Sequence, residues 1–187
     1  RAGREGEGSE VRLAGFEWGT PPGLDLQGCC ERWAELPLLF QPGAAWNYGY
    51  FVFDVTRPEE PKLVTSISGV AGGGSYHTFT PTPDGRYAVT EMEYQYAPLR
   101  IFDLKPGLDG QVKTISRPIG AWVTDWKNLP HNHEVRWPYV FVSDYEDGLS
   151  IFNMMDPTNP YTVGYYDTYD GPHARGCRLD VGQLLQA

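Results

Sequence analysis

The sequence Leu149-Ser-Ile-Phe-Asn153 has two counterparts earlier in the chain, Tyr50-Phe-Val-Phe-Asp54 and Leu99-Arg-Ile-Phe-Asp103. In each copy an acidic or amide residue follows the phenylalanine, and prolines come a few positions later. The copies recur about every 50 residues, and repeats of roughly 20 to 50 residues are typical of solenoids, propellers and similar arrays. The chain is therefore predicted to be built from repeated units that pack on their neighbours.

Each repeat has the pattern of an antiparallel meander. Tyr139–Ser143 is rich in the aromatic and β-branched residues that favour strands, and Asp147-Gly148 after it is a typical hairpin signal. A third strand is expected at Tyr161–Tyr165 and, in the preceding repeat, at Val112–Ile115. The predicted fold class is all-β, a partial β-propeller of about three antiparallel blades with one short N-terminal helix.

The stretch Phe141–Asn153, followed by Asp156–Tyr166, resembles the LVIVD-repeat β-propeller proteins of bacteria. The likeness is specific at residues 139–169, good at 74–115 and partial at 50–68. It implies a secreted or surface-exposed protein, and hence an extracellular or periplasmic location. Most members of that family have no assigned activity.

The segment before the repeats has a different character. Asp25–Leu36 is the expected helix, with an acidic start and a proline just beyond its end. Leu36–Gly49 resembles the stretch before the catalytic tyrosine of β-lactamase-like serine hydrolases, with Tyr48 at the tyrosine position. The sequence contains no Ser-x-x-Lys motif, so the nucleophile of that family is missing. A remnant of such a hydrolase or esterase is one alternative function.

These changes divide the chain into four predicted segments. They are a flexible lead at 1–23, a helix-containing segment at 24–49, propeller-like repeats at 50–173 and a C-terminal tail at 174–187. The abrupt change of resemblance at Tyr48–Phe51 suggests a fused reading frame of the kind found in metagenomic sequences. Divergence in a terminal cap is the other interpretation.

Charge and length limit the partners. The formal net charge is −9, with no basic cluster, which argues against nucleic-acid binding. No run of apolar residues is long enough for a membrane span. A closed propeller has about four to eight blades, and about three fit in this chain. Strand edges would then be exposed, so a homo-oligomer formed through those edges is a further expectation.

The histidines are the best candidates for chemistry. His77 and His133 open the first strands of consecutive repeats, and His131 and His173 lie in similar positions. The first strand of a propeller blade lines the central channel, so we expect these imidazoles to converge there as ligands of copper, zinc or iron. Glu134 and Asp144 are expected to support them. A distant similarity to selenium-binding, thiol-oxidising propellers implies a metal-dependent oxidoreductase, whereas purely structural histidines are the alternative.

Aromatic side chains suggest a second kind of site. Rings crowd the loops and edges of the repeats, where they can stack on sugars or on a peptide. The predicted ligand-binding residues are Trp122, Trp126, Trp137 and Tyr145. Packing between blades is the alternative role for such rings. Glu91 and Glu93 form a pair of carboxylates that we interpret as loop charge or calcium ligands.

The function predicted from these observations is that of an extracellular-type β-propeller repeat protein, acting as a binding or scaffold module for a protein or carbohydrate. The metal-dependent oxidoreductase and the hydrolase remnant are the alternatives. The sequence leaves open whether the protein is an enzyme.

Overall fold

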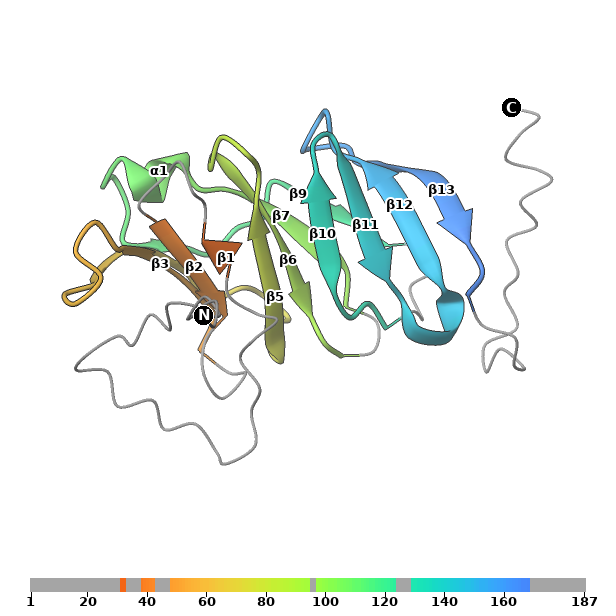
Figure 1. Cartoon of the computed structure of the whole chain (residues 1–187), viewed down its shortest axis with the longest axis horizontal. Helices are drawn as coiled ribbons and strands as arrows, with labels where there is room; N and C mark the ends of the chain where they lie inside the picture. The colour runs from red at the N-terminus through yellow and green to blue at the C-terminus, as the bar shows by residue number, and fades with distance from the viewer. Residues whose placement is uncertain (1–30, 33–37, 43–47, 95–96, 124–128, 169–187) are drawn as a thin grey trace, which may run out of the picture.

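The computed structural model describes residues 31–32, 38–42, 48–94, 97–123 and 129–168. The described residues form three β-sheets that stand side by side, with the first sheet at one end and the third at the other (Figure 1). No helix in this part of the chain is long and apolar enough to cross a membrane.

The first sheet has the strand order β1-β2-β3-β4-β8. Its strands are β1 (Glu31–Arg32), β2 (Leu38–Pro42), β3 (Tyr50–Asp54), β4 (Lys62–Ile67) and β8 (Thr114–Ile115). The first four are antiparallel, and β8 adds to β4 in parallel. Because β2 pairs with β3, this sheet begins before residue 50.

The second sheet has the order β5-β6-β7-β9, and all its pairings are antiparallel. Its strands are β5 (Tyr76–Pro81), β6 (Tyr87–Met92), β7 (Leu99–Asp103) and β9 (Gly120–Trp122). The prediction that Val112–Ile115 completes this repeat is wrong. After β7 the one-turn helix α1 (Lys105–Leu108) redirects the chain, so that β8 joins the first sheet and β9 supplies the outer strand of the second.

The third sheet has the order β10-β11-β12-β13 and is antiparallel throughout. Its strands are β10 (His133–Arg136), β11 (Tyr139–Ser143), β12 (Leu149–Asn153) and β13 (Tyr161–Tyr166). The predicted hairpin at Asp147-Gly148 is confirmed. Gly148 has φ +80° at the end of the short 3₁₀ helix η2 (Tyr145–Asp147), a conformation that glycine adopts without strain.

Two apolar cores hold the sheets together. The first and second sheets share a core that includes Tyr50, Val52, Phe79 and Phe102. The second and third share another, in which the Trp122 ring stacks on Phe152 with a centroid separation of 4.5 Å. Phe102 and Phe152 thus face the preceding sheet, as expected if each unit buries its face against its neighbour.

The predicted N-terminal helix lies mostly outside the described residues. Where it can be compared, Glu31 and Arg32 form strand β1 and pair with β2, so the helix prediction is wrong for these two residues. The helix within the described part of the chain is α1, in the second repeat. The mostly β fold in repeated antiparallel sheets is confirmed.

Candidate metal centre

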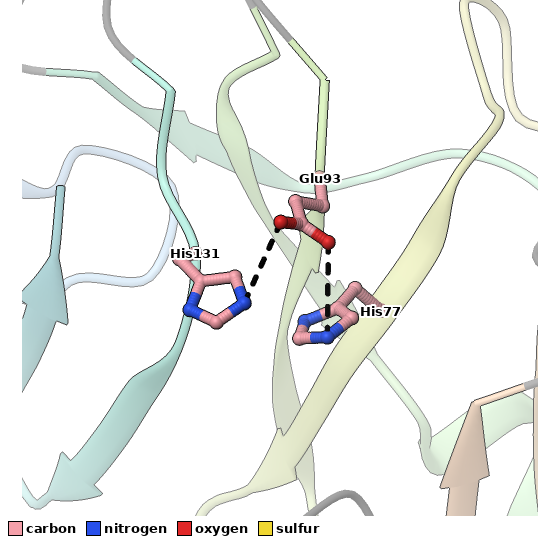
Figure 2. A group of neighbouring side chains, drawn as sticks. All are labelled: His77, Glu93 and His131. Atoms are coloured by element: carbon pink, nitrogen blue, oxygen red, sulfur yellow. Dashed lines mark ion pairs between the residues drawn. The ribbon is translucent and has the colours of Figure 1, made fainter. Parts of the chain in front are cut away.

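Three side chains from separate segments meet where the second and third sheets lie side by side. His77 is the second residue of β5, Glu93 directly follows β6, and His131 precedes β10 (Figure 2). Glu93 lies between the two imidazoles. Its Oε2 is 3.9 Å from His77 Nε2, and its Oε1 is 3.5 Å from His131 Nε2. One potential ligand atom of each residue lies within 4.8 Å of the others.

The backbone explains how His77 reaches this place. The ladder between β5 and β6 is regular except for a register shift between Tyr76 and Thr78, where the extra residue is His77. A β-bulge of this kind re-aims a side chain. Next to it, the Thr78 hydroxyl donates to Asn132 Oδ1 at 2.8 Å, which joins β5 to the segment before β10.

Backbone hydrogen bonds to the last residue of β11 hold His131 in place. Its backbone N–H donates to the Ser143 carbonyl at 2.9 Å, and the Ser143 N–H donates back to Asn132 at 2.8 Å. The imidazole is partly buried, and this burial lowers its pKa, with the Glu93 carboxylate acting in the opposite direction. A neutral imidazole is the form that binds metal ions.

Glu91 lies behind His77, away from solvent. Its side chain is fully buried, and its Oε2 is 3.2 Å from His77 Nδ1. Burial raises the pKa of Glu91 to about 10, and the nearby carboxylates of Glu93 and Asp144 add to the effect. Metal-binding histidines usually present their second ring nitrogen to a carboxylate or carbonyl. His77 Nδ1 lies 3.2 Å from Glu91 Oε2 and 3.0 Å from the Thr78 hydroxyl oxygen, while Nε2 faces Glu93.

Tyr145 covers the solvent side of the group. Its backbone has φ +47°, unusual for a residue other than glycine, and strained residues of this kind often cluster at functional sites. The phenol donates a hydrogen bond of 2.5 Å to Glu93 Oε1, and the ring lies 5.0 Å from the His131 ring. This hydrogen bond raises the pKa of Tyr145 to about 12. Tyr145 is 48% exposed, whereas the side chains of His131, Glu93 and His77 are 33%, 17% and 15% exposed.

The separations of Glu93 from the two imidazoles are close to those of a metal site. Zinc binds imidazole nitrogen and carboxylate oxygen at about 2.0–2.2 Å, which places two ligand atoms of a tetrahedron roughly 3.4 Å apart. The observed separations of 3.5 and 3.9 Å exceed this by tenths of an ångström. The His77 and His131 rings are stacked at 4.8 Å, so ligation of one ion would require an imidazole to turn about its Cβ–Cγ bond.

The structure separates His133 from the other predicted metal ligands. His133 is buried between the second and third sheets, where Nε2 donates to the Val89 carbonyl at 3.2 Å. Burial lowers its pKa to about 3. His131 and His133 would share a face only on a continuous strand, but β10 begins at His133. His173 lies outside the described residues.

The two predicted supporting carboxylates also differ in position. Glu134 is exposed and forms an ion pair with Arg136. Asp144 is buried, and its charge acts on Glu91. Asp144 is thus the one that lies near the histidine group.

The four predicted ligand-binding aromatic residues do not form one surface. Trp122 is only 4% exposed, and its indole N–H donates to Thr162 at 3.1 Å. Trp122 therefore packs between sheets, which was the alternative role for these rings. Trp137 is 39% exposed, Tyr145 belongs to the histidine group, and Trp126 lies outside the described residues.

Sequence reasoning missed the roles of Glu91 and Glu93. Both were noticed as a carboxylate pair, but the pairing of β5 with β6 is what brings them to His77. A signal was available, because the two strands of an antiparallel hairpin run in opposite directions, which places a residue after β6 beside one at the start of β5.

Comparison with known proteins identifies the architecture. No family model and no curated protein sequence matches the chain. Among solved structures, it is similar to the Cps50 (Swd1) β-propeller domain of Myceliophteria thermophila, with a TM-score of 0.51 and 12% sequence identity. The fold is part of a β-propeller. The match covers 73% of this chain and 38% of the other, so the chain spans well under half of that propeller.

Proposed function

We propose that this chain is a propeller-type binding module whose ligand is a divalent transition metal held by His77, Glu93 and His131. The observation that carries the proposal is the meeting of two imidazoles and one carboxylate from three separate segments. The buried carboxyl of Glu91 behind His77 supports it, because metal-binding histidines usually have such a partner.

The ligand types restrict the ion. Imidazole suits zinc, copper and iron, whereas calcium and magnesium prefer sites made of oxygen ligands. Two imidazoles and one carboxylate also occur in catalytic zinc sites, which keep a further position open for water or substrate. Zinc is the simplest probe because it has no redox chemistry.

Isothermal titration with zinc tests this proposal on chelator-washed protein. We expect about one equivalent to bind, and binding to be lost in His77→Ala and in His131→Ala. Glu93→Gln tests the carboxylate ligand in the same way. Its matched control is Glu134→Gln, because Glu134 is a surface carboxylate outside the group. Failure of the wild-type chain to bind zinc, copper or iron would refute the proposal, as would equal binding by folded His77→Ala.

A metal-dependent oxidoreductase is the second candidate. The observation that favours it is the partial exposure of the His131 side chain, which is 33% accessible to solvent at the edge of the group. Two histidines and one carboxylate with open positions are also the ligand set of non-haem iron oxygenases. Oxygen consumption by the copper- or iron-loaded chain with a small thiol tests it, and His131→Ala should abolish any activity.

The extracellular or periplasmic location and membership of the LVIVD-repeat proteins remain predictions from the sequence. So does binding of a protein or carbohydrate, which exposed rings such as Trp137 support. Glycan-array binding by the chain, compared with Trp137→Ala, would test the carbohydrate alternative.

A further inference from the structure

The outer face of the third sheet corresponds to faces that are covered in the first two. In each sheet the strand with the repeat phenylalanine places two apolar side chains on the face toward the following sheet, and the next strand adds a third beside them. The strand pairings make the sets equivalent: Tyr50, Val52 and Ile67; Leu99, Ile101 and Trp122; Leu149, Ile151 and Tyr166.

Burial differs sharply between these sets. All six side chains of the first two sets are at most 4% exposed, because the following sheet packs on them. In the third set Leu149 and Ile151 are partly exposed, and Tyr166 is 67% exposed. Tyr139 and Phe141, on the same face, are also accessible to solvent. The third sheet thus presents a junction face that has no sheet packed on it within the described part of the chain.

Close backbone contacts occur at the two junctions between described sheets, the first with the second and the second with the third, and they show which residues can meet at such a junction. At each filled junction, the fifth residue after the repeat phenylalanine contacts the preceding sheet. The residue that it contacts there is the strand partner of Val52 at the first junction and of Ile101 at the second. At the first junction Gly107 lies against Thr65, and at the second Pro157 lies so close to Gly120 that a Cβ there would collide with its carbonyl. A small residue on one side thus accommodates a larger one on the other.

The residues needed for a third contact of this kind are present, one on the uncovered face of the third sheet and the other on the first sheet. Gly164 pairs with Ile151 and therefore holds the place of Thr65 and Gly120. At Gly164 the atoms nearest to an added Cβ belong to Ile151 of its own sheet, at 3.3 Å or more. Pro58 is the fifth residue after Phe53 and holds the place of Pro157. The glycine that a proline turn requires is thus present on the uncovered face.

We propose that the first sheet of a second copy of this chain covers this face, head to tail. A head-to-tail contact closes into a ring when its rotation allows. The described residues of two copies supply six sheets, which is within the roughly four to eight blades of known propellers, whereas those of three copies would exceed it. The expected assembly is a closed dimer, and this inference does not depend on metal binding.

The exposed side chains of the third and first sheets identify the residues that would form the proposed contact between copies. On the third sheet, Tyr166 holds the register position of Trp122 and is 67% exposed. On the first sheet Phe53 is already buried in the single chain, so Pro58 and Leu63 supply most of the new contact. Leu63 is 56% exposed and pairs directly with Phe53, which places it on the same face.

Sedimentation velocity of the full chain tests the proposal. We expect twice the mass of one chain, and a return to the monomer mass in Tyr166→Glu, Gly164→Val and Leu63→Glu. Met155→Glu is the matched control, because Met155 is equally exposed but lies in the turn after β12. Circular dichroism of each variant shows whether the sheets remain folded.

The outcomes separate the possible occupants of the face. A wild-type chain that sediments as a monomer would overturn the proposal, as would a dimer that persists in Tyr166→Glu. A dimer that is lost in Tyr166→Glu but retained in Leu63→Glu would mean that two third sheets pair with each other, which also contradicts the head-to-tail arrangement. An equimolar mixture of Tyr166→Glu and Leu63→Glu should recover dimer, since one junction between them is intact.

Discussion

At the level of single residues, the proposed centre depends on a carboxyl group that lies behind a ligand. Glu91 is buried with Oε2 3.2 Å from His77 Nδ1, while Nε2 of the same ring faces Glu93. Loss of such a partner typically weakens metal binding about 10- to 100-fold. We therefore expect zinc affinity to fall by this factor in Glu91→Gln, measured by competition with a chromophoric chelator.

Glu134→Gln serves as the control for this measurement, because it removes an exposed carboxylate from β10 without touching His77. A folded Glu91→Gln variant with unchanged zinc affinity would show that the carboxyl does not orient the imidazole.

His133 predicts a pH dependence of stability in the metal-free chain. Its pKa is about 3 in the folded state and ordinarily 6.5. Between these values the unfolded chain binds the extra proton, so the contribution of His133 to stability is present above pH 6.5 and is lost as the pH falls. The slope from this one group is at most about 1.4 kcal/mol per pH unit. Urea denaturation at several pH values measures it.

His133→Asn should show a shallower slope over the same pH range, whatever its overall stability. Equal slopes in the two proteins would mean that His133 is not held neutral by burial.

At the level of elements, Gly120 makes a close contact between the second and third sheets. A Cβ at this position would collide with the Pro157 backbone, and overpacking of this kind usually costs about 1–3 kcal/mol. Gly120→Ala should therefore lower the free energy of unfolding by at least that amount. Gly164→Ala, at the equivalent position of the third sheet, should change it by less than about 0.5 kcal/mol.

Both glycine variants are best compared in a Tyr166→Glu background, so that self-association does not contribute to the measured free energy. Equal losses of stability in urea denaturation would show that the second junction is not packed as tightly as the structure indicates.

The strands of the repeats could be predicted from sequence because their apolar alternation and turn residues are local signals. Leu99–Asp103 and Leu149–Asn153 are strands as expected. Thr114–Ile115 could not be assigned to the first sheet, because its parallel pairing with β4 depends on the turn made by α1. Gly120–Trp122 is too short, and too rich in small residues, to give a strand pattern.

The candidate site was predictable only in part for a similar reason. His77 and His131 were expected from their places before strands, whereas Glu93 joins them through the register of β5 with β6. His133 has the same local sequence signal as His131. Because β10 begins at His133, however, the His133 side chain lies between the second and third sheets and bonds to Val89. The pairing of strands from different segments cannot be read from the local pattern of one sequence.

At the level of the whole molecule, the second sheet contributes to both apolar cores. Unfolding should therefore be a single transition, and damage to one core should lower the stability of the whole. Phe152→Ala removes a fully buried ring that stacks on Trp122, which typically costs about 3–5 kcal/mol. The measurement is urea denaturation followed by both tryptophan fluorescence and circular dichroism.

Met155→Ala is the control for this change, because the exposed Met155 side chain follows β12 but lies outside the core. Two separate transitions in Phe152→Ala, or a loss below about 1 kcal/mol, would contradict a shared core.

The metal centre is the central claim, and anomalous diffraction from crystals of the zinc-loaded chain tests it most directly. We predict one anomalous peak within bonding distance of His77 Nε2, His131 Nε2 and a Glu93 oxygen, about 2.0–2.2 Å from each. An empty site at full zinc occupancy elsewhere, or a peak that contacts none of these three side chains, would contradict the claim.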